Sequence, residues 1–147
     1  MRNILLGLSL AFLTAMPAQS VAKDKVTLYD KLGGEKGVHN IVWSMLRQTH
    51  SDPRTAEVME NSNIDRNAKL IIEYICAKTD GPCEYTGQEM HIAHHGLGIT
   101  TAHFNALVEN LQKAMRDEGI PFSVQGQLLA HLAPEYRNVV VRSRKGE

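Results

Sequence analysis

Three of the seven histidines lie within five consecutive residues, at His91, His94 and His95. Neutral imidazole is the side chain that most often binds a metal ion, so this cluster is the first candidate for chemistry. On a helix, one face carries positions i, i+3, i+4 and i+7, which are the mostly apolar Met90, Ala93, His94 and Leu97. His91 and His95 then point roughly 100° away from that face, toward solvent. The spacing predicts that His94 is the buried histidine and the one placed to bind a metal.

Two other interpretations fit the same cluster. A histidine on an apolar face is often an ordinary core residue whose ring nitrogens are hydrogen-bonded. The i, i+4 pair of His91 and His95, with His103 nearby, is also compatible with zinc. The glutamate of an H-E-x-x-H zinc protease is missing, however, and no third ligand has a recognisable spacing. Zinc binding is therefore the weakly supported alternative.

The N-terminal residues have the three-part layout of a secretory signal peptide. A short basic start precedes the uncharged run Ile4–Met16, and Ser20–Ala22 follows before the chain becomes charged. The uncharged run is shorter than the ~20 residues of a transmembrane helix, so an uncleaved anchor is the less favoured alternative. We expect residues 1–22 to be a signal peptide for export to a bacterial periplasm. Residues 23–147 then form one domain, with no stable membrane span after cleavage.

Charge and cysteine content narrow the function classes. The formal net charge is zero and no basic run is long enough to indicate nucleic acid binding. Cys76 and Cys83, the only cysteines, are seven residues apart, which in an oxidising compartment favours a disulfide closing a small loop. The alternative is two unpaired thiols, with Cys76 as a small core residue. Because the chain has no C-x-x-C-H sequence, covalent attachment of a c-type haem is not indicated.

Hydrophobic residues recur with helical spacing through most of the chain, and strand-like alternation is almost absent. Four stripes result: Val38, Ile41, Val42, Met45 and Leu46; Leu70, Ile71, Tyr74 and Ile75; Phe104, Leu107, Val108, Leu111 and Met115; and Val124, Leu128, Leu129 and Leu132. Capping residues predict where the last three helices begin: between Ser62 and Asp65, at Thr100 or Thr101, and at Pro121 or Ser123. Pro134 is expected to interrupt the last helix. Four helices with short connections predict an all-α domain.

Several motifs occur in the order and spacing of a known family: Leu28–Glu35, Gly81–Pro82, Tyr85–Gly87, Met90, His94, Gly98–Thr100, His103–Phe104 and Leu132–Pro134. With these motifs the chain resembles a truncated haemoglobin of group I, the N-type branch, from about Leu28 to Val140. The resemblance implies a truncated globin fold, which is a two-over-two helical sandwich around one haem b (iron protoporphyrin IX). It also implies that His94 is the proximal iron ligand. The apolar stripe and the resemblance thus select the same histidine.

The resemblance also indicates which residues line the distal side of the haem. The position that usually carries the distal tyrosine is Leu46, and its usual aromatic neighbour is Met45. Met59 replaces the aromatic residue at the next corner, and Ile71 occupies the position that is often glutamine. Asn67, one turn before Ile71, is the one amide near enough to donate a hydrogen bond, or else a polar residue on an exposed helix face. The other haem contacts are expected from apolar residues of the stripes: Met90, Phe104, Leu107, Leu128 and Leu132.

This distal pocket is more apolar than the family pattern, which predicts weaker retention of oxygen and readier autoxidation. The reason is that a hydrogen-bond donor beside bound oxygen slows its release. Tyr74 is the alternative source of that hydroxyl if its side chain turns inward. Candidates for the haem propionates are chosen by position and chemistry, with solvated surface as the equal alternative for each: Arg66, Lys69, Tyr85 and His91.

Three function classes follow. The first is binding of a diatomic gas, oxygen or nitric oxide, at five-coordinate iron on His94, with nitric oxide dioxygenase-type enzyme activity only if an external reductase is available. The second is a periplasmic electron-transfer haem protein with six-coordinate iron, in which Met45 or Met59 supplies the second axial ligand. The third is a non-haem metal-binding helical protein that uses the histidine cluster.

Overall fold

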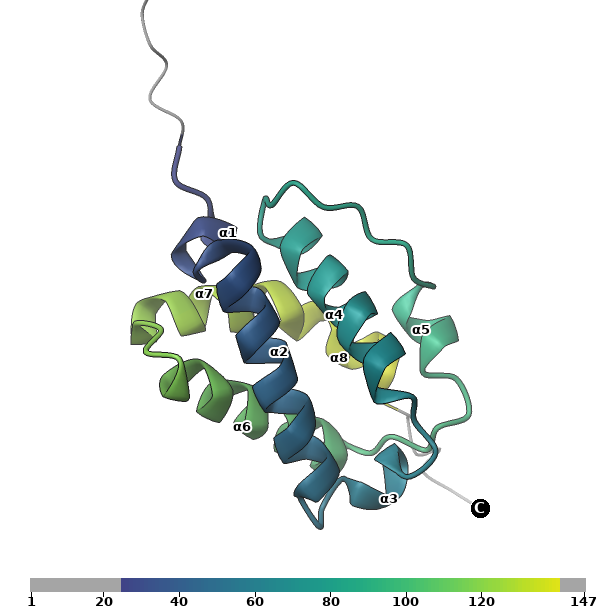
Figure 1. The fold of residues 1–147 in the computed structure, drawn as a ribbon. Coiled ribbons are helices and arrows are strands. Elements are labelled where there is room, and N and C mark those ends of the chain that lie inside the picture. The colour runs from purple at the N-terminus through teal and green to yellow at the C-terminus, as the bar shows by residue number, and fades with distance from the viewer. Residues whose placement is uncertain (1–24, 141–147) are drawn as a thin grey trace, which may run out of the picture.

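The computed structural model describes residues 25–140, and this range is helical with no β-strand. Its long helices are α2 (Gly34–Ser51), α4 (Ile64–Lys78), α6 (Thr101–Asp117) and α7 (Phe122–Leu132) (Figure 1). Short helical segments join or follow them: α1 (Leu28–Lys31), α3 (Ala56–Met59), α5 (Met90–Ala93), η1 (Ala133–Glu135) and α8 (Tyr136–Val139). None of the helices in this range is long and apolar enough to span a membrane. The predicted signal peptide, residues 1–22, lies outside the described residues.

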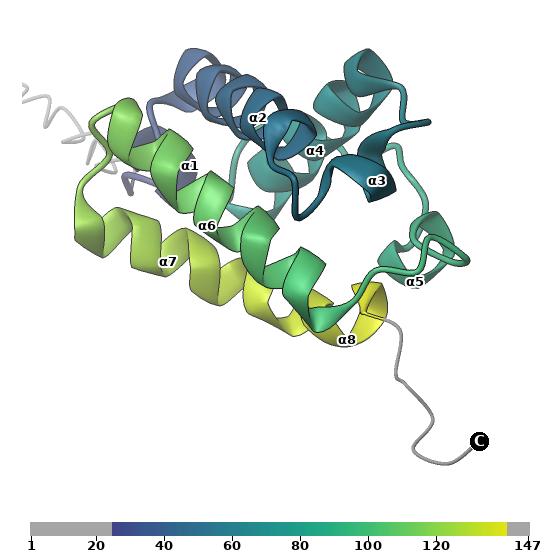
Figure 2. The same ribbon diagram turned by 90° about the horizontal axis from the view of Figure 1, so that it is seen from below.

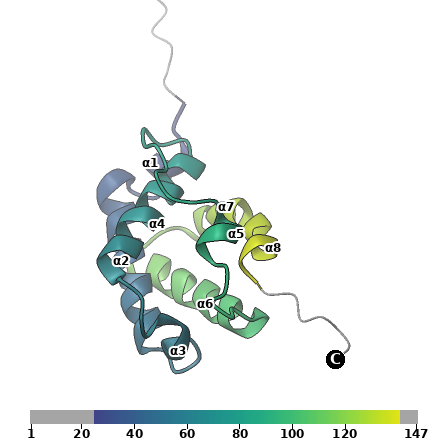
Figure 3. The same cartoon turned by 90° about the vertical axis from the view of Figure 1, so that its right-hand side faces the viewer.

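The four long helices form two layers. Figure 2 shows α2 and α4 in one layer, and α6 and α7 side by side in the other. Helix α2 contacts both its layer partner α4 and the helix α6 of the opposite layer. The short α5 lies beside α8, away from α2 (Figure 3). The predicted all-α, two-over-two arrangement is therefore confirmed.

Burial follows the hydrophobic stripes unevenly. All five stripe residues of α2 are buried: Val38, Ile41, Val42, Met45 and Leu46. In α6, Leu111 and Met115 are buried, but the earlier stripe residues Phe104, Leu107 and Val108 are only half-buried. In α4, Ile75 is buried, whereas Leu70, Ile71 and Tyr74 are half-buried. The first half of α6 and the middle of α4 thus carry apolar surface that the protein's own packing covers incompletely.

The helix starts lie where the capping residues predict them. The Asn63 side chain accepts a hydrogen bond from the Arg66 amide (2.9 Å), and Thr100 accepts one from the His103 amide (3.3 Å). Helix α7 begins directly after Pro121. At Pro134 the α-helical path is interrupted by the 3-10 segment η1, as expected.

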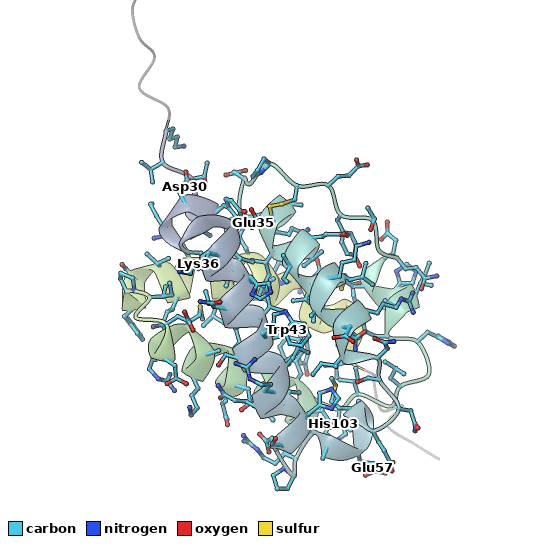
Figure 4. The ribbon with its side chains drawn as sticks, viewed as in Figure 1. Asp30, Glu35, Lys36, Trp43, Glu57 and His103 are labelled. Carbon is cyan, nitrogen blue, oxygen red and sulfur yellow. A yellow bond between two sulfur atoms is a disulfide. The ribbon has the colours of Figure 1, made fainter. Side chains whose placement is uncertain are left out.

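Two short helices, α1 and α3, were not expected from the stripes. Helix α1 carries a capping box in which Thr27 and Asp30 bond each other's backbone amides (2.9 and 3.1 Å); Asp30 is labelled in Figure 4. The T-x-x-D spacing is a recognisable signal for such a start. Helix α3 has no side-chain cap, so sequence reasoning had no comparable signal there.

Two covalent or ionic contacts fix the ends of helices. Cys76 and Cys83 form a disulfide with Cα atoms 5.7 Å apart, which confirms the predicted pairing.

At the end of α2, the Asp52 carboxylate accepts hydrogen bonds from Arg54 Nη2 (2.8 Å) and from Asn110 Nδ2 of α6 (3.2 Å). Hydrogen bonds from Arg54, and to a lesser degree from Asn110, hold the pKa of Asp52 well below its usual range.

Candidate haem site

His94 is the C-terminal cap of α5, and its ring is oriented by the backbone of the same short helix. Its Nδ1 atom lies 2.8 Å from the carbonyl oxygen of Met90. Because a carbonyl can only accept, Nδ1 must carry the proton in this contact, and Nε2 then carries the lone pair. A backbone carbonyl that fixes the tautomer in this way is a typical partner of a metal-binding histidine.

The surroundings of His94 differ from the expected buried helical face. Helix α5 ends at Ala93, and Leu97, expected on the same face, is 49% exposed. The chain leaves the helix because Gly96 and Gly98 have φ angles of +77° and +65°, which glycine adopts without the steric penalty of other residues. His94 is consequently half-buried rather than buried.

The other two histidines of the cluster do not assemble a metal site. His91 and His95 are exposed, as predicted. His103, labelled in Figure 4, lies in the first turn of α6, where its Nδ1 accepts from the Thr100 amide (3.3 Å). Within residues 25–140, no group of three histidine, cysteine, aspartate or glutamate side chains is arranged to hold a metal ion. The zinc interpretation therefore gains no support.

The residues expected to contact haem divide into two groups by burial. Leu46 of α2 and Leu128 of α7 are 1% and 0% exposed and belong to the hydrophobic core. The others are half-buried and come from α3, α4, α5, α6 and α7: Met59, Asn67, Ile71, Met90, Phe104, Leu107 and Leu132. Half-buried apolar side chains on both layers, with an imidazole presenting Nε2, suit a flat apolar macrocycle that holds a metal. The residue set fits haem, and the individual contacts remain predictions.

Tyr74 does not act as the distal donor in this structure. Its hydroxyl donates to the Glu135 carboxylate at 2.5 Å, across the space between α4 and η1. The pKa of Tyr74 is raised, chiefly by burial of the hydroxyl and secondly by its hydrogen bond to Glu135. The same hydrogen bond lowers the pKa of Glu135. With this hydroxyl engaged, the half-buried Asn67 is the polar residue left among the predicted distal side chains.

The proposed propionate partners are mostly occupied or solvated. Lys69 pairs with Glu73 (3.8 Å), and the Tyr85 hydroxyl donates to the carbonyl of Gln88 (2.8 Å). Arg66 and His91 are exposed. These contacts assign none of the four to a propionate.

Sequence reasoning missed the contact between Glu73 and Thr86. The Thr86 amide and hydroxyl both donate to one carboxylate oxygen of Glu73, at 3.1 and 2.7 Å. These hydrogen bonds hold the pKa of Glu73 below its usual range. The two residues are thirteen apart across a loop, so no helical or strand periodicity links them.

A two-layer helical sandwich with half-buried apolar residues in both layers, and a half-buried histidine whose Nδ1 is bonded to a backbone carbonyl, is typical of a haem protein of the globin class. Residues 27–138 match the bacterial-like globin family. The chain belongs to this family and, within it, to the group 1 truncated haemoglobins. Membership implies haem as cofactor and haem-based binding of diatomic gases.

Individual relatives agree with this placement. The chain is 29% identical to a group 1 truncated haemoglobin of Tetrahymena thermophila over 101 residues, covering 69% of this chain and 84% of that protein. It is 30% identical to that of Tetrahymena pyriformis over 98 residues, covering 67% and 81%. The crystal structure of the T. pyriformis protein in its Fe(III) form superposes with a TM-score of 0.75 at 25% identity, covering 79% of this chain and 99% of that one. A group II truncated haemoglobin of Bacillus anthracis, at 19% identity and a TM-score of 0.74, shares the fold.

Proposed function

We propose that this protein binds a diatomic gas at the iron of a non-covalently held haem b, with His94 Nε2 as the proximal ligand. The observation that carries the proposal is the 2.8 Å contact between His94 Nδ1 and the Met90 carbonyl, which leaves the lone pair on Nε2. When bound, haem supplies an iron whose coordination position opposite His94 can accept the gas. His91 and His95 are exposed and serve as internal controls.

Absorption spectra of the ferric, ferrous and ferrous carbon monoxide forms test this assignment. A single broad ferrous band that sharpens with carbon monoxide is expected for a five-coordinate site. His94→Gly should lose haem or change this spectrum, and added imidazole should restore it, whereas His91→Gly and His95→Gly should resemble wild type. Unchanged haem content and spectra in His94→Gly would show that another residue binds the iron.

We further propose that the distal side holds oxygen weakly. Leu46, Met59 and Ile71 carry no hydrogen-bond donor in their side chains, and the Tyr74 hydroxyl is bonded to Glu135. One neutral hydrogen bond contributes about 0.5–1.5 kcal/mol, which corresponds to roughly a few-fold to ten-fold in the rate of oxygen release. Oxygen handling with rapid exchange therefore fits better than long-term oxygen storage.

The Leu46→Tyr variant tests the distal proposal, with Leu46→Phe as its matched control. Both variants place a ring at a position that is 1% exposed, so they share any packing cost, and only tyrosine adds a hydroxyl. Oxygen dissociation should be slower in Leu46→Tyr than in Leu46→Phe and wild type. Equal rates in the tyrosine and phenylalanine variants would contradict the proposal that the missing hydroxyl at position 46 makes oxygen retention weak.

A periplasmic location is part of this proposal. It is supported by the signal-peptide layout of residues 1–22 and by the Cys76–Cys83 disulfide, since such bonds persist in oxidising compartments. Cell fractionation and N-terminal sequencing should find a mature chain that starts at Lys23. Nitric oxide dioxygenase-type turnover would in addition need an external reductase to return the iron to the ferrous state.

Electron transfer at six-coordinate iron is the second candidate function. Met45 is 3% exposed within the core, whereas Met59 of α3 is half-buried and is the thioether better placed to turn toward haem. Sharp, split ferrous bands without added ligand, abolished by Met59→Leu, would favour this function over gas binding.

A further inference from the structure

The chain between α4 and α5 is fastened to the side of α4. Three contacts join them within one turn of that helix: the Cys76–Cys83 disulfide, an edge-to-face contact of Tyr74 with Tyr85 (5.1 Å between ring centroids), and the Glu73–Thr86 hydrogen bonds. This segment leads directly into α5 and His94. The contacts therefore connect α4, which carries Asn67 and Ile71, to the proximal histidine.

The Glu73–Thr86 contact is stronger than an ordinary surface hydrogen bond. Two donors of Thr86 converge on Glu73 Oε2, and the acceptor is a carboxylate, which makes both bonds charge-assisted. The Glu73 side chain is only 18% exposed, so solvent screens it less than a fully exposed group. Lys69 adds an ion pair to the same carboxylate at 3.8 Å.

The residues on either side of Thr86 form a turn held by local contacts. The Tyr85 hydroxyl donates to the Gln88 carbonyl (2.8 Å), and the Tyr85 ring folds back over Gly87. A Cβ atom at position 87 would overlap the Tyr85 ring, so this close approach requires glycine. The turn around Thr86 thus lies between the Glu73 contact and the start of α5, so a shift of Thr86 is expected to move that start.

Of the three contacts, the disulfide is a less direct link to His94 than the Glu73–Thr86 hydrogen bonds. The turn that it closes is also held by Gly81 N–H donating to the Cys76 carbonyl (2.8 Å) and by Thr79 Oγ1 donating to the Ile75 carbonyl (2.6 Å). Thr86 lies three residues nearer to His94 than Cys83 does. Among the hydrogen bonds and ion pairs of residues 25–140, the Glu73–Thr86 pair is the last that joins α4 to the chain before His94.

We propose that Glu73 is a positioning residue for the proximal histidine: by holding Thr86 it sets the height and tilt of α5, and thereby the iron–His94 bond. This inference rests on the proposed role of His94 as the iron ligand. A group bonded directly to a metal ligand typically changes metal affinity by about 10–100-fold when removed. Glu73 acts on His94 only through residues 86–93, so a smaller effect is expected. Loss of the Glu73–Thr86 contact should therefore weaken haem retention without removing any group that touches haem.

The test uses the haem-loaded mature protein and two variants that break the contact from opposite sides. Glu73→Ala removes the acceptor, and Thr86→Val removes the shorter of the two bonds while leaving the Lys69–Glu73 ion pair. Thr86→Ser keeps both donors and should restore wild-type behaviour. Asp117→Ala is the matched control, because it deletes an exposed carboxylate that pairs with Lys113 at i, i+4 on α6 (2.8 Å).

The main readout is the iron–histidine stretching band of the ferrous protein, measured by resonance Raman spectroscopy. The band should shift and broaden in Glu73→Ala, less so in Thr86→Val, and remain at the wild-type position in Thr86→Ser and Asp117→Ala. Haem transfer to an acceptor globin should be roughly a few-fold faster in Glu73→Ala, below the range for direct partners of a metal ligand. A purely structural role of Glu73 would lower thermal stability but leave the band in place.

Two outcomes separate the failure of this inference from failure of the proposed function. If His94→Gly abolishes the band, imidazole restores it, and both Glu73→Ala and Thr86→Val retain the wild-type band, then His94 is the ligand but Glu73 does not position it. If His94→Gly itself retains the band, His94 is not the iron ligand, and the proposed positioning role of Glu73 is refuted as well. Should Glu73→Ala not fold, the Thr86→Val and Thr86→Ser pair decides the question alone.

Discussion

Two regions of the molecule are held together by different physical means. The four long helices bury a continuous apolar core that includes Ile41, Leu111, Met115 and Leu128, each at most 4% exposed. In residues 80–99, which carry His94, only Ile99 is buried. That segment is held by one disulfide, the Glu73–Thr86 hydrogen bonds, the Tyr74–Tyr85 ring contact, the packing of α5 against α8 and short-range contacts within its own turns.

The difference shows how the fold separates stability from adjustment of the site. Apolar burial in the helical layers is non-directional and contributes most of the folding free energy. The polar and covalent contacts of residues 80–99 contribute less, but they are directional and fix the orientation of a few groups. Changes in the first region should therefore alter stability, and changes in the second should first alter the iron site that we propose at His94.

The largest expected effect is a cavity in the helical region. Met115→Ala removes a side chain that is 0% exposed, and should lower the free energy of unfolding by about 2–5 kcal/mol. The matched change in the other region, Leu97→Ala at 49% exposure, should stay within about 0.5 kcal/mol. Denaturant titration of both variants measures the contrast. Equal losses of unfolding free energy in the two variants would mean that residues 80–99 contribute to the hydrophobic core as the long helices do.

The next effect concerns the disulfide. Replacing Cys76 and Cys83 together by alanine should lower the stability of the oxidised protein by roughly 2–3 kcal/mol, because the cross-link restricts a short loop of the unfolded chain. Wild-type protein unfolded in the presence of a reductant should match the double variant. If the variant is as stable as oxidised wild type, the bond does not stabilise this region.

A smaller effect is expected at the boundary of the two regions. Thr100 caps α6 with its hydroxyl, and Thr100→Ala should cost about 1 kcal/mol because the His103 amide loses its acceptor. Thr100→Ser retains the hydroxyl and should be close to wild type. Thermal unfolding of Thr100→Ala and Thr100→Ser measures how much the capping hydroxyl stabilises the protein. Equal unfolding midpoints in the two variants would show that the hydroxyl contributes nothing.

The smallest effects are expected from titration, and they compare one carboxylate from each region. Hydrogen bonds from Arg54 lower the pKa of Asp52, and those from Thr86 lower that of Glu73. A carboxyl whose pKa is lower in the folded than in the unfolded state stabilises the protein above the unfolded value of about 4 and loses that contribution on acidification. Stability should therefore fall as the pH drops below about 4, and less steeply in Asp52→Asn and Glu73→Gln. Unfolding midpoints recorded on either side of pH 4 test whether stability falls on acidification. If stability depends on pH equally steeply in wild type and in both variants, the prediction is contradicted.

Helix positions were largely predictable because their signals are local. Asn63, Thr100 and Pro121 mark helix starts through side-chain or ring chemistry that acts within one turn. The α2 stripe was buried as expected, since its residues all face the neighbouring helices. The helical face Met90, Ala93, His94 and Leu97 was predicted wrongly in its second half, because α5 ends at Ala93 and residue spacing does not show how early a helix ends before Gly96.

The sequence by itself determined the all-α class, the starts of α4, α6 and α7 and the Cys76–Cys83 pairing, because each depends on residue type and short-range spacing. The choice of His94 among the three histidines rests on the same kind of spacing and stays a prediction. Only the tertiary structure decided that Tyr74 bonds Glu135, sixty-one residues away, and that Glu73 holds Thr86 across a loop. Such contacts depend on how helices pack and how far a loop reaches, and neither leaves a periodic trace in the sequence. For the same reason, the half-burial of His94 could be learned only from the folded chain.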